Sequence, residues 1–199
     1  MLYNDGTAGF LTIIFGPMFS EKSGELIKKC KYAKRYQHKE VLIYKPAIDD
    51  RFSEDEVVSR LGLTEKALNL SQDLAENNII SDIYAQCENM DIVAFDEAQF
   101  FSKEIVIVVD YLVAKKKHVI VSGLNLDFLG RTFGYIKDLS MFADEIILKN
   151  AYCNQCGRPA GYTQRLINSV AVTDIHSQTI VIGDEESYEA RCRLCFVRE

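Results

Sequence analysis

The 199-residue chain has no tryptophan, only three prolines, and no apolar run near the roughly 20 residues that a membrane-spanning helix requires. It also lacks an excess of basic residues, because 23 Lys and Arg stand against 29 Asp and Glu, a net charge of −6. Sequence-independent binding to nucleic acid needs a basic surface, so we expect neither nucleic acid nor a membrane as a partner. The apolar run at 10–19 follows Asp5 rather than basic residues, and no small-residue cleavage site comes after it. We therefore expect no signal peptide and a cytoplasmic protein.

Apolar residues make up 48% of the chain and fall in short runs separated by helix-like stretches. Runs without polar alternation predict buried strands at 11–15, 41–45, 91–95, 118–122 and 145–148. Periodic stretches predict helices at 22–36, 72–86 and 102–117, and 46–64 reads as a polar loop. This alternation indicates an α/β fold, with a parallel sheet flanked by helices and ligands at the carboxyl ends of its strands.

The first predicted strand leads directly into an eight-residue motif: Gly16, Pro17, Met18, Phe19, Ser20, Glu21, Lys22 and Ser23. Seven of the eight positions fit the phosphate-binding pattern G-x-x-x-x-G-K-[ST] in its strand-to-helix context. In such a loop, backbone N–H groups hold phosphate oxygens, Lys22 reaches the β- and γ-phosphates, and the Ser23 hydroxyl binds Mg²⁺. The one position that does not fit is the sixth, normally glycine, where Glu21 would crowd the loop and its carboxylate would repel a triphosphate. A chance match within an ordinary turn is the alternative.

The third predicted strand ends in the acidic pair Asp96 and Glu97. A hydrophobic strand that delivers an aspartate to its carboxyl end is the Walker-B arrangement, in which the carboxylate holds Mg²⁺. Glu97 is then a candidate general base for phosphoryl transfer to a hydroxyl group, while Asp96 serves the metal. Without the phosphate loop, a solvated glutamate at a strand end would be the simpler interpretation.

Two C-x-x-C pairs lie in the last 50 residues, formed by Cys153, Cys156, Cys192 and Cys195. Four thiolates complete a tetrahedral Zn²⁺ site and leave no open position, so we expect a structural metal; a redox motif or buried thiols are the alternatives. Cys30 and Cys87 have no partner pattern and are expected to be buried. Residues 150–199 carry no basic excess, so the 35 residues between the pairs suggest a functional lid rather than a nucleic-acid surface.

Together these features resemble the type II (cellular-type) thymidine kinases from Gly16 to Cys195. The matching stretches, besides the cysteine pairs, are GPMFSEKS at 16–23, KPAIDDR at 45–51, DEAQFF at 96–101, SGLNLDFLGRTFG at 122–134, TQRLIN at 163–168 and ESYEARC at 186–192. The resemblance implies a P-loop nucleotide-binding kinase domain at 1–149 and a zinc-binding lasso domain at 150–199. It also implies that the γ-phosphate of ATP passes, with Mg²⁺, to the 5′-hydroxyl of thymidine or deoxyuridine.

The resemblance further implies the roles of single residues. Glu97 looks like the catalytic base, and Ser23 and Asp96 look like the magnesium partners. The ATP-binding residues would be Gly16, Pro17, Met18, Phe19, Ser20, Glu21, Lys22, Ser23, Asp96 and Gln99. The nucleoside-binding residues would be Met18, Asp49, Arg51, Phe101, Leu124, Phe128, Phe133, Val181, Gly183 and Tyr188, although plain core packing would account for one or two of the aromatic residues. A lasso between the cysteine pairs, feedback inhibition by dTTP and a homotetramer are implied as well.

Several positions depart from the family pattern. Relatives usually have glycine at Glu21, a second glycine at Asp184, proline at Thr132, and often histidine at Arg60. Two functional classes therefore stay open: an active kinase with a modified phosphate loop, and a weakened or inactive nucleotide-binding relative. A zinc-ribbon interaction module is disfavoured by the charge and by the family matches at 45–134. We predict the active kinase, with the Glu21 side chain directed away from the phosphates.

Overall fold

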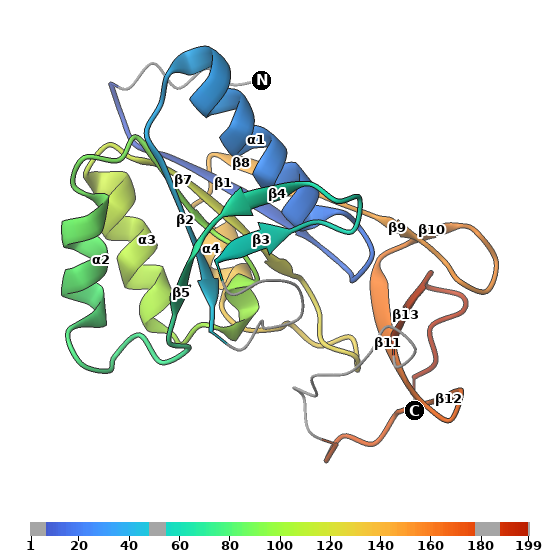
Figure 1. Cartoon of the computed structure of the whole chain (residues 1–199). Helices are drawn as coiled ribbons and strands as arrows, with labels where there is room; N and C mark the ends of the chain where they lie inside the picture. The colour runs from blue at the N-terminus through green and yellow to red at the C-terminus, as the bar shows by residue number, and fades with distance from the viewer. Residues whose placement is uncertain (1–6, 48–54, 178–187, 199) are drawn as a thin grey trace.

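The computed structural model describes residues 7–47, 55–177 and 188–198 (Figure 1). Its centre is a six-stranded parallel sheet in the order β5–β2–β6–β7–β1–β8. The strands are β1 (Phe10–Gly16), β2 (Val41–Pro46), β5 (Leu68–Leu70), β6 (Ile92–Phe95), β7 (His118–Leu124) and β8 (Glu145–Leu148). All five predicted strands are present, so the α/β fold with a parallel sheet is confirmed. The short edge strand β5 was not expected.

Helices cover both faces of this sheet (Figure 1). On one face lies α1 (Lys22–Gln37), whose buried positions recur at helical spacing and include Leu26, Ile27 and Cys30. The other face is covered by α2 (Ile79–Cys87), α3 (Glu104–Ala114) and α4 (Ile136–Ser140). The inner strands β1, β2, β6 and β7 are largely buried on both sides because each side packs against helices. The edge strand β8 differs from the expected buried strand, since Ile146 and Leu148 are exposed.

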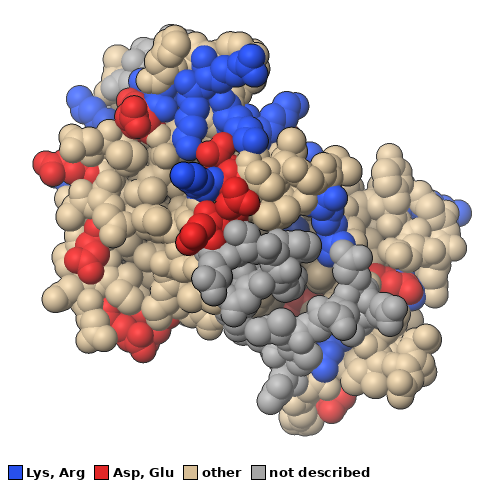
Figure 2. Space-filling view, viewed as in Figure 1, with Lys and Arg blue, Asp and Glu red and all other residues tan. Residues whose placement is uncertain are grey.

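The solvent-facing side of α1 is basic. Lysine and arginine side chains gather over this helix (Figure 2). Lys28, Lys31 and Arg35 of α1 are exposed. Other basic residues of α1 are paired, since Lys34 contacts Glu65 at 2.9 Å. The amphipathic pattern that predicted the helix therefore matches its orientation.

Two predictions about the chain between β2 and β6 are wrong in part. The helix expected at 72–86 begins only at Ile79, because Asn77 and Asn78 have φ angles of 36° and 59°, in the left-handed region that asparagine tolerates. The loop expected at 46–64 contains β3 (Glu56–Val58), which pairs antiparallel with β4 (Thr64–Lys66). Val57 of this hairpin packs with the buried side of α1.

A second group of strands follows the main sheet. It consists of β9 (Ala151–Tyr152), β10 (Pro159–Ala160), β11 (Tyr162–Ile167), β12 (Val170–Ala171) and β13 (Tyr188–Arg191). β9 and β10 form a hairpin, and β11 pairs antiparallel with both β12 and β13. In the part of the chain that the structure describes, no helix has the length and apolar character to cross a bilayer.

Candidate active site

The predicted phosphate loop joins the carboxyl end of β1 to the first turn of α1. Phe19 and Glu21 have φ angles of 68° and 58°, in the left-handed region. Each such non-glycine residue costs about 1–2 kcal/mol, and strain of this kind is concentrated at ligand sites. The loop therefore holds a tight turn at the position where the motif predicts phosphate binding, and it does so without the usual second glycine.

The side chain of Lys22, the first residue of α1, reaches back to the start of this loop. It is 7% exposed, and its Nζ donates a hydrogen bond of 2.8 Å to the Pro17 carbonyl oxygen. Burial lowers the pKa of Lys22, while the carboxylates of Glu97 and Asp96 act in the opposite direction. The ammonium group is therefore within electrostatic range of the acidic pair on β6.

Asp96 follows directly after β6 and is buried. It accepts hydrogen bonds from the hydroxyl groups of Ser122 and Ser23. Burial, and then the neighbouring Glu97 carboxylate, raise the pKa of Asp96 to about 6. The structure thus brings Ser23 and Asp96 together, and a hydroxyl and a carboxylate oxygen are ligands that suit Mg²⁺.

Glu97 is half-buried and precedes the short 3₁₀ helix η1 (Ala98–Phe100). Its φ of 48° places it in the left-handed region, and it accepts a hydrogen bond of 2.5 Å from the Gln99 side-chain nitrogen. Lys22, Ser23, Asp96 and Glu97 therefore form one cluster at the carboxyl edge of the sheet, where parallel sheets bind ligands.

Sequence reasoning missed two residues of this cluster. Ser122 bonds to Asp96 because β7 lies beside β6 in the sheet, although the two residues are 26 positions apart in the chain. Arg60, in the turn between β3 and β4, places its guanidinium 4.3 Å from the Phe19 ring centroid and so brings a cation to the phosphate loop. Its only signal in the sequence was its departure from the family pattern.

The residues predicted to contact the nucleoside lie in different environments. Met18, at the phosphate loop, donates its backbone N–H to Thr163 Oγ1 at 2.9 Å. The rings of Phe133 and Phe100 pack edge-to-face, with their centroids 5.6 Å apart. Phe101 instead packs in the core, with its ring centroid 6.2 Å from that of Phe95.

Leu124 is buried at the end of β7, and Phe128 is buried with the Arg165 guanidinium 5.4 Å from its ring. Tyr188 begins β13 and pairs with Arg165. Four further predicted residues lie outside the described residues: Asp49, Arg51, Val181 and Gly183.

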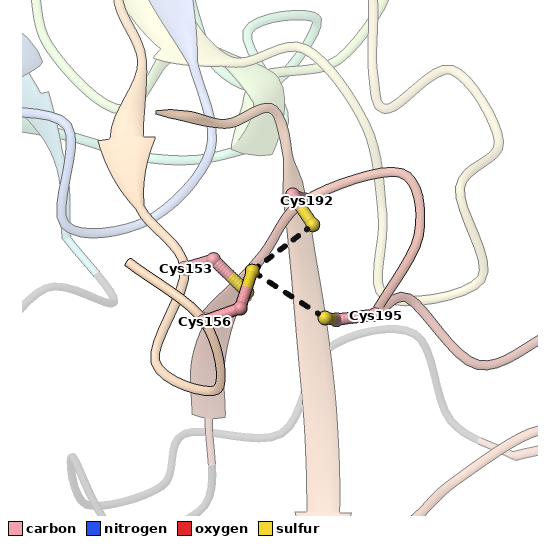
Figure 3. A group of neighbouring side chains, drawn as sticks. All are labelled: Cys153, Cys156, Cys192 and Cys195. Atoms are coloured by element: carbon pink, nitrogen blue, oxygen red, sulfur yellow. Dashed lines mark hydrogen bonds between the residues drawn. The ribbon is translucent and has the colours of Figure 1, made fainter. Parts of the chain in front are cut away.

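The four cysteines of the two C-x-x-C pairs converge (Figure 3), and their sulfur atoms lie within 4.8 Å of one another. Cys156 Sγ is 3.6 Å from Cys192 Sγ and 3.6 Å from Cys195 Sγ. Tetrahedral Zn²⁺ with Zn–S bonds of about 2.3 Å would separate its sulfur ligands by about 3.8 Å. All four are free thiols rather than disulfides, so the cluster fits zinc.

The two remaining cysteines behave as expected. Cys30 and Cys87 are buried in the two cores that flank the sheet, Cys30 on the buried side of α1 and Cys87 at the end of α2. Burial raises the pKa of the Cys30 thiol to about 12 and also raises that of Cys87. Neither thiol is poised for metal binding or nucleophilic chemistry.

Comparison with known proteins gives one family match. A family model described as "Thymidine kinase" matches residues 9–196. Among solved structures, the chain is similar to the X-ray structure of the Legionella pneumophila ATPase DotB, with a TM-score of 0.43 and 14% identity over 76% of this chain. The similarity covers 43% of the ATPase chain, and at that TM-score it carries no argument about function.

Proposed function

Because the chain belongs to the thymidine kinase family, we propose that it is an active kinase that transfers the γ-phosphate of ATP to the 5′-hydroxyl of thymidine, giving dTMP. The observation that carries this proposal is the cluster of Lys22, Ser23 and Asp96 beside Glu97. It combines a cation for phosphates, two oxygen ligands and a separate carboxylate, which are the parts that phosphoryl transfer to a hydroxyl requires.

In the proposed mechanism, the loop amides and Lys22 bind the triphosphate. Ser23 and Asp96 would hold Mg²⁺, which supplies positive charge to the phosphate oxygens when it is bound. Glu97 accepts the proton of the 5′-hydroxyl as the oxygen forms a bond to the γ-phosphorus. The bond to the ADP oxygen breaks, and Lys22 stabilises the charge that develops there.

The alternative is a weakened or inactive relative, and it depends on Glu21. A Cβ placed on Gly24 would lie 2.5 Å from Glu21 Oε2, so the Glu21 carboxylate lies against the side of the first turn of α1. Ser59 of the β3–β4 turn is near the same point, since its Cβ would be 3.4 Å from that added atom. This placement favours the active kinase, because the side chain extends along the helix rather than across its N-terminus.

The remaining assignments extend the same proposal. Met18, Leu124, Phe128 and Phe133 supply apolar surface for the thymine, and Phe101 supports them from the core. The segment that includes Val181, Gly183 and Tyr188 closes over the base, and Asp49 and Arg51 approach the nucleoside and phosphates. The cysteine cluster holds a structural Zn²⁺, which anchors both ends of that segment. We also propose a cytoplasmic homotetramer that dTTP inhibits by feedback.

The experiment that tests the proposal measures ADP release from ATP with thymidine, deoxyuridine, deoxycytidine, deoxyadenosine and deoxyguanosine in turn. The expected result is rapid turnover with thymidine and background rates with deoxycytidine, deoxyadenosine and deoxyguanosine. The ratio of the thymidine and deoxyuridine rates measures the contribution of the 5-methyl group of the base. Mass spectrometry of the product should identify dTMP. Background rates with all five nucleosides would favour the inactive relative.

A further inference from the structure

We infer that Gln99 is a positioning residue for the general base: it holds the Glu97 carboxylate in place and is itself fixed to the backbone of β7. This inference rests on the proposed function, since Glu97 is a base only if phosphate passes to a hydroxyl. It assigns Gln99 to Glu97, whereas the family resemblance assigns it to ATP.

The hydrogen bonds of Gln99 determine which way its amide points. Its Oε1 accepts the Leu124 backbone N–H at 2.9 Å, and its Nε2 donates to Glu97 Oε2 at 2.5 Å. A backbone N–H can only donate and a carboxylate can only accept, so only this orientation satisfies both neighbours. The Gln99 side chain is therefore a bridge from the end of β7 to the candidate base.

Close packing around Gln99 leaves that bridge little freedom. Gln99 is 3% exposed. A Cβ on Gly123 would lie 2.7 Å from Gln99 Oε1, and a Cβ on Gly134 would lie 2.8 Å from Gln99 Cα and closer still to its carbonyl oxygen. Gly134 also has a φ of +55°. Both neighbours must be glycine for Gln99 to occupy this position, which explains two glycines that no phosphate contact requires.

The backbone of Glu97 needs such support. Its φ and ψ of 48° and 40° are left-handed, and a strained residue of this kind persists only where the surroundings determine its conformation. The Lys22 ammonium is within electrostatic range of the Glu97 carboxylate and would attract it. The charge-assisted hydrogen bond from Gln99 fixes Glu97 Oε2 against this attraction.

The burial of Gln99 distinguishes a positioning role from direct binding of substrate. One end of the Gln99 amide is used by Leu124 and the other by Glu97, and almost none of the side chain reaches the surface. Removing Gln99 should then affect turnover through Glu97 and leave the Michaelis constants for ATP and thymidine nearly unchanged. A phosphate contact would affect the ATP constant first.

The test is a double-mutant cycle of Gln99→Glu with Glu97→Gln. Gln99→Glu keeps an acceptor for the Leu124 N–H but replaces the donor to Glu97 with a second carboxylate, and misplacing a catalytic group by about 1 Å costs about 100-fold. We expect kcat to fall about 10- to 100-fold with both Michaelis constants within about threefold. In the Glu97→Gln background the same change should alter kcat by less than about twofold. In that double variant residue 97 carries the amide and residue 99 the carboxylate, so a hydrogen bond between the two side chains can still form. Equal losses in both backgrounds, or a loss confined to the Michaelis constants, would overturn the inference.

Two further measurements complete the design. Gln86→Glu is the matched control, because Gln86 Oε1 accepts the Tyr44 hydroxyl at 2.8 Å away from the site, and it should leave kcat unchanged. The carboxyl ¹³C NMR signal of Glu97, assigned by its loss in Glu97→Gln, should shift in Gln99→Met and stay in place in Gln86→Met. An unshifted Glu97 signal refutes the contact whatever the enzyme phosphorylates, whereas a shifted signal in a protein without thymidine kinase activity refutes only the proposed function.

Discussion

The backbone N–H of Met18, in the phosphate loop, donates a hydrogen bond to Thr163 Oγ1 of β11 at 2.9 Å, across 145 positions of sequence. Thr163 is 3% exposed and pairs with Ala190 of β13, two residues before Cys192. The cysteine cluster and the phosphate loop are thus connected through one antiparallel strand pair. A metal that fixes the cysteines therefore also fixes a partner of the loop.

This connection predicts what zinc removal does. Metal analysis after gel filtration should give about one Zn²⁺ per chain, consistent with four thiolate ligands. Stripping the metal with a chelator should lower thermal stability and also raise the Michaelis constant for ATP severalfold, because Met18 loses its fixed acceptor. Cys156→Ser should lose the metal, and Cys30→Ala should keep it. Protein prepared without chelator that holds no zinc would count against the site, and the same gel filtration reports whether the chain is a tetramer.

Glu97→Gln should lower kcat by about 10²- to 10⁴-fold, the usual contribution of a positioned general base. Binding of Mg·ATP, measured by calorimetry, should be retained because Lys22, Ser23 and the loop amides are unchanged. The exposed Glu88, at the end of α2, offers a matched control, since Glu88→Gln should leave kcat as it is. A near-normal rate for Glu97→Gln would remove Glu97 from the role of base.

Glu21→Gly restores the usual glycine of the phosphate loop. The free energy of unfolding should rise by about 1 kcal/mol, because glycine adopts the left-handed φ of 58° without strain. Glu21 Oε2 is buried and has no hydrogen-bond partner among the described residues, so its removal leaves no bond unmade. The Michaelis constant for ATP should change by less than about threefold, because the Glu21 side chain lies along the first turn of α1 and away from the phosphates. A gain in kcat/KM of more than about tenfold would instead favour the weakened relative, and Glu21→Gln separates the effect of charge from that of size.

His118 should make stability depend on pH. Burial, and then the Lys29 ammonium, lower the pKa of His118 from 6.5 to about 4, and its Nε2 lies 2.9 Å from Thr12 Oγ1. The neighbouring carboxylates of Glu145 and Asp144 oppose this shift without reversing it. As the pH falls below about 6.5, the unfolded chain takes up a proton that the folded chain refuses, so the free energy of unfolding decreases.

The decrease should amount to about 2 kcal/mol between pH 7 and pH 5. Urea unfolding at both pH values should show it in the wild type and in the control His176→Gln, whose side chain is exposed. His118→Gln should lose most of this difference. An unchanged difference in His118→Gln would show that other groups control the acid sensitivity.

Much of the fold could be predicted because single features decide it. Apolar runs of four or more residues specify the strands, which are buried on both sides in the middle of the sheet, and the stripe of Leu26, Ile27 and Cys30 specifies the buried side of α1. The hairpin of β3 and β4 could not be predicted in this way. Its strands have three residues each, too few to show a period, and Val57 is buried only because α1 lies beneath it.

In the candidate site, too, local motifs could be predicted from the sequence and long-range contacts could not. The phosphate loop and the acidic pair are local motifs, so the sequence was sufficient to predict them. Ser122, Gln99 and Thr163 act through residues distant in sequence or through the glycines that surround them, and these relationships depend on strand order and close packing. Asn77 and Asn78 show the same limit for a helix, because asparagine fits both a helix and the left-handed turn that replaces it.

The most direct test of the account is a crystal structure with thymidine, Mg²⁺ and a non-hydrolysable ATP analogue. We predict that the triphosphate lies on the backbone amides of residues 16–23 with Lys22 on its terminal phosphates. The thymidine 5′-oxygen should then lie within about 2.6–3.2 Å of a Glu97 carboxylate oxygen. A triphosphate bound elsewhere, or a 5′-oxygen out of reach of Glu97, would contradict the central claim.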